Sequence, residues 1–161
     1  MIRLASTADA SAVCAIYNRY VTDSIVTFEE EPVTVPEMRQ RISAVIEKLP
    51  WLVLERDGGV AGYAYAGPWK TRIGYRLTVE SSIYLAPEQV RRGFGSVLYR
   101  VLLERLRALN VHCVIGGVAL PNPASVALHE KLGFTQVAHF RENGTKFGRW
   151  IDVAYWQQLL V

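Results

Sequence analysis

The 161-residue chain is half apolar and one-fifth charged, which suits one soluble domain with one hydrophobic core. Its net charge of +3 favours an anionic ligand but is too small to indicate nucleic-acid binding, and no apolar run approaches the roughly 18 residues of a membrane span. Two cysteines outside any CxxC pair cannot form a disulfide framework, and the N-terminus is too short and mixed for a signal peptide, so we expect a cytoplasmic protein.

The first third of the chain predicts a short edge strand followed by two helices. The strand is expected at residues 2–4. Ser6 followed by Asp9 is typical of a helix N-cap, and apolar residues then recur at helical spacing as far as Tyr20. Thr34 with Pro36 in the first turn repeats this signal, so we expect a second helix that runs to about Leu49.

Short apolar runs between turn residues predict six more strands and two more helices. The expected strands are residues 51–55, 60–66, 77–85, 111–118, 135–142 and 147–156, and the expected helices are residues 96–108 and 122–132. Hairpin turns are expected at residues 57–59 and at Asn143-Gly144-Thr145. The helix at 96–108 connects two strands that should therefore be parallel. The pattern predicts an α+β fold class (α/β mixed sheet): one domain over 1–161 with a mostly antiparallel sheet of about seven strands and helices on both faces.

The segment Val90-Arg91-Arg92-Gly93-Phe94-Gly95-Ser96 lies between an expected strand and an expected helix. Glycines let a backbone turn tightly and approach phosphates, and the N–H groups at a helix start attract a pyrophosphate. Taken alone, the segment is equally typical of a glycine turn with solvated arginines. It lacks the third glycine of the dinucleotide fingerprint and the Gly-Lys-Ser/Thr of the triphosphate loop.

A second element follows at a fixed distance: Asn122-Pro123-Ala124-Ser125, and then Leu128-His129-Glu130-Lys131-Leu132-Gly133-Phe134. Together the two elements resemble the GCN5-related N-acetyltransferase (GNAT) family, although Val90 stands where that family has Gln or Arg. Four further runs look like the phosphinothricin and methionine sulfoximine N-acetyltransferases of this family: residues 16–18, 64–70, 78–82 and Lys146-Phe147-Gly148-Arg149-Trp150.

The resemblance implies the GNAT fold and two catalytic residues. Glu80 matches the general base, which takes a proton from an amine before it attacks a thioester. A carboxylate in mid-strand could equally lie on a solvated sheet face. His129 occupies the place of the residue that protonates the departing thiolate in many members, but a packing histidine would fit the same pattern. Both interpretations of His129 stay open.

The resemblance also implies the binding residues. The cosubstrate acetyl-CoA, with no metal, would be held by backbone groups or side chains of Ile83, Tyr84, Leu85, Arg91, Arg92, Gly93, Phe94, Gly95, Ser96 and Asn122. The acceptor pocket would be lined by Phe28, Tyr65, Lys70, Thr71, Arg72, Tyr75, Ser81 and Ser82. Solvated loop charge is the alternative for Lys70 and Arg72, and an N-cap role for Asn122.

We therefore expect acetyl transfer from acetyl-CoA to the α-amino group of a small amino-acid-like acceptor of the phosphinothricin, methionine sulfoximine or methionine sulfone type. Neither a nucleic-acid nor a membrane partner is expected, and a homodimer is expected by analogy with the family. Three alternatives stay open: an acetyltransferase for protein or peptide N-termini, a non-catalytic acyl-CoA-binding module, and a purely structural domain.

Overall fold

The computed structural model describes residues 1–160, which form one seven-stranded sheet in the order β1-β2-β3-β4-β5-β7-β6. The strands are β1 (Ile2–Leu4), β2 (Trp51–Arg56), β3 (Gly59–Pro68), β4 (Thr78–Leu85), β5 (Cys113–Ala119), β6 (Thr135–Lys146) and β7 (Arg149–Leu159). The helices are α1 (Ala10–Asp23), α2 (Val35–Ile46), α3 (Phe94–Ala108) and α4 (Pro123–Lys131). Only the β4–β5 pair is parallel, so the predicted α+β class with a mixed sheet is confirmed.

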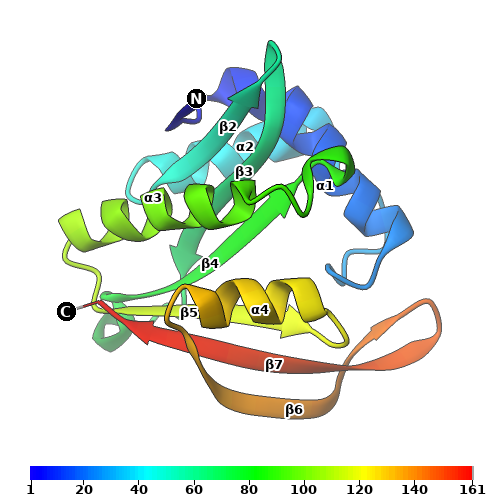
Figure 1. Cartoon of the computed structure of the whole chain (residues 1–161), viewed down its shortest axis with the longest axis vertical. Coiled ribbons are helices and arrows are strands. Elements are labelled where there is room, and N and C mark those ends of the chain that lie inside the picture. Colours follow the sequence, from blue (N-terminus) through cyan, green and yellow to red (C-terminus); the bar gives the residue numbers. More distant parts are fainter. Residues whose placement is uncertain (161) are drawn as a thin grey trace.

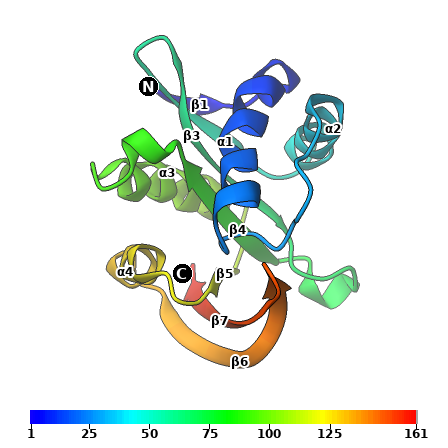
Figure 2. The same cartoon turned by 90° about the vertical axis from the view of Figure 1, so that its right-hand side faces the viewer.

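Helices cover both faces of the sheet, as Figures 1 and 2 show. One core lies between the sheet and α1 with α2, where Val13, Ile42 and Val53 are fully buried. The other core lies on the opposite face, where α3 contributes Leu98, Leu102 and other buried residues. Residues of the buried strands such as β2 therefore face one of two different helix layers, and the alternation of side chains along a strand decides which.

The predicted capping residues Ser6 and Thr34 make the expected hydrogen bonds, Ser6 at a short 3-10 turn (Thr7–Asp9) that leads into α1. The Ser6 side chain accepts a hydrogen bond from the Ala8 N–H, and the Asp9 carboxylate accepts one from the Ser6 N–H. Thr34 caps α2 by accepting from the Glu37 N–H. The second helix ends at Ile46, earlier than expected, and α3 begins at Phe94, two residues before its expected start. Gly93 is its N-cap with a φ of 81°, so the helix begins inside the glycine loop.

The sheet opens between β4 and β5. These strands pair only over three residues of each, from Thr78 opposite Cys113 to Glu80 opposite Ile115. Beyond that point β4 continues along β3 and β5 continues along β7, so the two strands diverge, as Figure 1 shows. The β4 edge from Ser81 onward therefore has no strand beside it among the described residues, so the N–H and C=O groups of alternate residues on this edge lack a strand partner.

The final hairpin differs from the prediction. Strands β6 and β7 extend past Asn143-Gly144-Thr145 and turn at Phe147 and Gly148, which have positive φ values of 51° and 69°. Asn143-Gly144 has the composition of a hairpin turn, but it lies at an irregularity of β6 between Phe140 and Gly144. A strand irregularity and a turn both favour such residues, and tertiary packing decides between them.

Candidate active site

A narrow cavity of about 60 Å³ lies where β4 and β5 diverge. Its lining comes from the free end of β4, the end of β5, the start of α4 and the loop after α1. The residues are Val26, Ser81, Ser82, Ile83, Tyr84, Gly117, Val118, Ala119, Asn122, Ser125 and His129. Predicted catalytic, cofactor and acceptor residues therefore meet at one opening of the sheet.

The start of α3 presents free backbone donors beside this opening. No side chain caps the helix, and its first turn follows Gly93 and Arg91, which both have positive φ. An added Cβ at Gly95 would lie 3.6 Å from both Leu85 and Leu128, so this backbone packs closely on β4 and α4. Four N-terminal amides of a helix lack intrahelical partners, and the dipole favours an anion there. The geometry fits a pyrophosphate, and exposed Arg91 and Arg92 add charge.

Asn122 is the N-cap of α4, because its side-chain oxygen accepts a hydrogen bond from the Ser125 N–H at 3.1 Å. Its side-chain nitrogen makes no hydrogen bond within residues 1–160, while the residue lines the cavity. The cap therefore orients the amide, and its donor stays available to a carbonyl group of a ligand. The N-cap and the predicted cofactor contact are compatible.

Glu80 is the last residue of β4 that pairs with β5, and its carboxylate lies near Gly117 of β5. An added Cβ at Gly117 would lie 3.4 Å from the Glu80 Oε1 and 3.0 Å from the Tyr155 ring. Within the described residues this carboxylate has neither a hydrogen bond nor a cationic partner. Burial therefore raises the pKa of Glu80 above its ordinary value. A half-buried carboxylate with a raised pKa and free lone pairs can accept a proton near neutral pH.

Tyr155 lies beside this carboxylate and contacts two further aromatic rings, and sequence reasoning assigned no role to Tyr155. The Tyr155 ring lies 5.7 Å from Trp69 and 5.8 Å from Phe140, centroid to centroid. Burial raises the pKa of Tyr155, and the charge of Glu80 adds to this rise. Tyr155 lies on β7, distant in sequence from Glu80, and the pairing of β7 with β5 brings it to this carboxylate.

The predicted acceptor residues do not all lie on one surface of the protein. Tyr65 and Ser82 are paired across β3 and β4, and Tyr65 stacks on Trp51 with ring centroids 4.1 Å apart. Ser81 does not share their surface: its side chain is 5% exposed and bonds the Tyr99 hydroxyl on the α3 side of the sheet. Since neighbouring strand residues face opposite ways, Ser81 and Ser82 cannot both direct their hydroxyls to one acceptor surface.

The loop between β3 and β4 is exposed. The Lys70 ammonium lies 5.2 Å from the centre of the Trp69 ring, which connects Lys70 with the aromatic surroundings of Glu80. Thr71, Arg72 and Tyr75 are exposed, and their side chains make no hydrogen bond within residues 1–160. Their assignment to the acceptor pocket stays a prediction.

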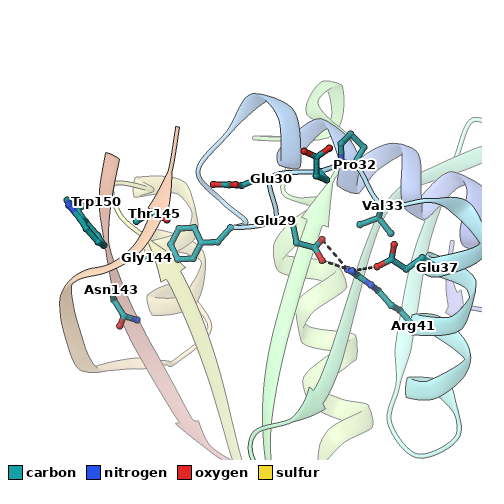
Figure 3. A pocket seen from close by; sticks show the side chains of 12 residues that line it. Glu29, Glu30, Pro32, Val33, Glu37, Arg41, Asn143, Gly144, Thr145 and Trp150 are labelled. Atoms are coloured by element: carbon teal, nitrogen blue, oxygen red, sulfur yellow. Dashed lines mark hydrogen bonds and ion pairs between the residues drawn. The ribbon is translucent and has the colours of Figure 1, made fainter. Parts of the chain in front are cut away.

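Phe28 lies on the loop between α1 and α2, at an open groove of about 810 Å³. Its ring lies against Gly144 of β6, and Figure 3 shows Gly144, Thr145 and Trp150 across the groove from Glu29 and Glu30 of this loop. The groove runs between that loop and the β6–β7 hairpin, with Trp150 on the far side. Val26, two residues before Phe28, lines the β4–β5 cavity, so the loop connects the groove with the strand opening.

His129 is 4% exposed and engaged at both ring nitrogens. Its Nδ1–H donates to the Ser125 carbonyl at 2.7 Å, because a carbonyl can only accept. Burial lowers the pKa of His129, so Nε2 is an acceptor for the Tyr99 hydroxyl at 3.2 Å. The Tyr99 oxygen in turn is bonded to Ser81. The one ring N–H of His129 is bonded to Ser125 and the other ring nitrogen to Tyr99, which favours the packing interpretation of His129 over a direct role as an acid.

A family model described as an Acetyltransferase (GNAT) domain matches residues 2–155. The chain belongs to the GNAT acetyltransferase family. This GNAT chain is 45% identical over 157 residues to the phosphinothricin N-acetyltransferase of Streptomyces viridochromogenes, an alignment that covers 98% of the chain and 86% of that protein.

Two solved structures extend the comparison. A GNAT superfamily phosphinothricin acetyltransferase from Sinorhizobium meliloti, in complex with AcCoA, is similar with a TM-score of 0.95 and 38% identity, covering 99% of this chain and 88% of that one. A ribosomal-protein-alanine N-acetyltransferase from Brucella melitensis is similar with a TM-score of 0.97 and 37% identity, covering 99% of both chains. The predicted family is confirmed, and the GNAT chain is an acetyl-CoA-dependent acetyltransferase.

Two negative findings concern the described part of the chain. No helix in residues 1–160 is long and apolar enough to cross a membrane. In the same residues no group of three or more His, Cys, Asp or Glu side chains is placed to hold a metal ion.

Proposed function

We propose that the enzyme acetylates the α-amino group of a small amino-acid-like acceptor of the phosphinothricin, methionine sulfoximine or methionine sulfone type, with Glu80 as general base. The carboxylate of Glu80 carries the proposal, because it is half-buried, has no hydrogen-bond or cationic partner within residues 1–160, and lies where β4 and β5 diverge. An ammonium group must lose a proton before its nitrogen becomes a nucleophile, and the raised pKa of Glu80 suits that task.

The residues of the strand opening would hold the donor. The β4 edge over Ile83, Tyr84 and Leu85, which no strand covers among the described residues, suits the extended arm of the donor, which would pair with β4 like an added strand. The amides from Arg91 to Ser96 suit its diphosphate, and the amide nitrogen of Asn122 suits a carbonyl of the arm. The donor supplies an acetyl thioester, and an N–H at the end of β4 would stabilise negative charge developing on its carbonyl oxygen.

The surroundings of Glu80 favour direct attack by the amine over a covalent enzyme intermediate. Both cysteines are buried and lie outside the cavity at the strand opening. On the acceptor side, Tyr65, Ser82 and Phe28 would line the pocket, and Lys70 would pair with the acceptor carboxylate. Ser81 would act from beneath the opening through Tyr99, without touching the acceptor.

A thiol-release assay with acetyl-CoA tests the proposal across phosphinothricin, methionine sulfoximine, methionine sulfone and the parent amino acids. We expect turnover with one or more of the analogues, and a loss of roughly 10²- to 10⁴-fold in kcat for Glu80→Gln at unchanged acetyl-CoA affinity. Glu104→Gln, an exposed change on α3, serves as the matched control. Full activity of Glu80→Gln would refute the role of Glu80, and acetyl-CoA binding without turnover by the wild type would indicate a non-catalytic binding module.

Acetylation of a peptide N-terminus is the second candidate, because the groove beside Phe28 is open and one similar structure is a ribosomal-protein-alanine N-acetyltransferase. Mass spectrometry after a competition between methionine sulfone and a short peptide with N-terminal alanine distinguishes the two. We expect acetyl transfer to the sulfone, and preferential acetylation of the peptide would select the second candidate.

The proposed assembly is a homodimer, by analogy with the phosphinothricin branch of the family. Sedimentation equilibrium of the full chain measures this directly: a mass of twice 18.1 kDa is expected, and a mass of 18.1 kDa at micromolar concentration would refute it.

A further inference from the structure

A buried lysine of the β6–β7 hairpin has no role in the proposed chemistry. Lys146 is 1% exposed, and its ammonium donates to two backbone carbonyls, those of Thr27 and Glu29, at 2.7 Å each. Burying an ammonium group is unfavourable unless it is well hydrogen-bonded. The two acceptors lie on either side of Phe28 in the sequence, so one cation of β6 holds both backbone neighbours of Phe28.

The side chain of Phe28 is held by the same strand. Its ring lies against Gly144, two residues before Lys146, so closely that an added Cβ at Gly144 would overlap three of its ring atoms. Gly144 has no positive φ and lies within β6, so the space for the ring is the visible reason for a glycine here.

Side chains of α1 and α2 hold Thr27 and Glu29 as well. The Tyr17 hydroxyl bonds the Thr27 hydroxyl at 2.7 Å, and the Arg41 guanidinium binds both carboxylate oxygens of Glu29. These contacts fix the side chains of Thr27 and Glu29, whereas Lys146 fixes their backbone. Strand β6, through Lys146 and Gly144, contacts the loop on both sides of Phe28 and at its ring.

We propose that Lys146 is a positioning residue: it holds the Thr27–Glu29 backbone so that the Phe28 ring, seated on Gly144, forms a fixed wall of the acceptor pocket. The β6–β7 hairpin thereby sets the affinity for the acceptor without touching the donor site. This inference rests on the proposed function, because it takes Phe28 as an acceptor-pocket residue. It also gives a structural role to Lys146, the first residue of the Lys146-Phe147-Gly148-Arg149-Trp150 run.

Steady-state kinetics of Lys146→Met and Gly144→Ala test the proposal with methionine sulfone as the acceptor. Methionine preserves the length of the lysine and removes its donors, and alanine displaces the Phe28 ring without touching Lys146. We expect both variants to raise the KM for the acceptor by roughly tenfold, because small displacements of a positioning group weaken binding strongly. The KM for acetyl-CoA should change less than about twofold, and exposed Lys131→Met should match the wild type.

A double mutant identifies the route of the effect. If Lys146 acts through Phe28, Lys146→Met in a Phe28→Ala background should add less than about a twofold further rise in the acceptor KM. Equal rises in the KM values of acceptor and donor, or full additivity with Phe28→Ala, would overturn the proposal. If Lys146→Met does not fold, Gly144→Ala decides the same question.

Hydrogen exchange measured by mass spectrometry provides a readout that needs no turnover. Lys146→Met should accelerate exchange in residues 24–33 while peptides from α3 exchange as in the wild type. Unchanged exchange in residues 24–33 would refute the role of Lys146. A wild type that acetylates none of the acceptors would refute the proposed function instead, and the exchange data would still show whether Lys146 holds this loop.

Discussion

Gly116 of β5 is a position where one added methyl group should disturb a buried polar network. A Cβ built there would overlap the His129 Nε2 and lie 2.8 Å from its Cδ2. The imidazole cannot move freely, because its Nδ1–H is bonded to the Ser125 carbonyl and its ring packs edge-on against Tyr99 and Phe134. Gly116→Ala therefore forces His129 away from the Tyr99 hydroxyl.

The expected magnitude has two parts. Overpacking a filled core costs about 1–3 kcal/mol. Loss of the bond between the Tyr99 hydroxyl and His129 adds about 1 kcal/mol. The sum, about 2–4 kcal/mol, corresponds to a fall in Tm of about 4–16 °C for a domain of this length.

Thermal and urea unfolding followed by circular dichroism measure the effect at pH 7.5. Gly67→Ala on β3 is the matched control, since an added Cβ there meets no atom within 4 Å, and it should unfold like the wild type. In a His129→Ala background the space is vacated, so Gly116→Ala should then cost less than about 1 kcal/mol. Equal unfolding of Gly116→Ala and Gly67→Ala, or an undiminished cost in the His129→Ala background, would refute the reasoning.

Three further predictions follow from local structure. Because burial raises the pKa of Glu80, the folded state disfavours the charged carboxylate, so Glu80→Gln should raise the Tm at pH 8. This gain in Tm should vanish below pH 4, where the wild-type carboxyl is protonated in both the folded and the unfolded state. The bond to Arg3 lowers the pKa of Asp9, so Asp9→Asn should lower the free energy of unfolding by about 1–2 kcal/mol at pH 7. This difference should shrink as the pH falls below the ordinary pKa of Asp, and urea unfolding at pH 7 and pH 3 measures it. Gly148→Ala should cost about 1–2 kcal/mol in the same assay, because the residue has a φ of 69°, and an unaffected variant would contradict the observed position of the hairpin turn.

Local signals in the sequence predicted the structural features that depend on neighbouring residues. The glycines at 93 and 95 and the caps at Ser6, Thr34 and Asn122 act over three or four residues, so their structural consequences follow from spacing alone. The parallel β4–β5 pair also followed, because a strand, a helix and a strand in succession permit little else.

Local reasoning was wrong where the same residue types are compatible with two different local structures. Asn143-Gly144 has the residues of a hairpin turn, yet Gly144 lies within β6, where it provides space for the distant Phe28 ring. Ser81 and Ser82 are adjacent in a motif, but the pleat sends them to opposite faces, and the partner of Ser81 is Tyr99 on α3. Such a partner has no signature in the strand itself.

By itself, the sequence determined the family, the order of the elements and the loop that suits a diphosphate, because these depend on periodicity, caps and short motifs. Only the tertiary structure decided which groups surround Glu80, whether His129 has a free nitrogen, and what Lys146 holds. Those properties arise from the pairing of β5, β6 and β7 and from the loop after α1, which bring together residues more than a hundred positions apart. Burial and hydrogen bonding at such contacts are set by packing, and packing is a property of the whole fold.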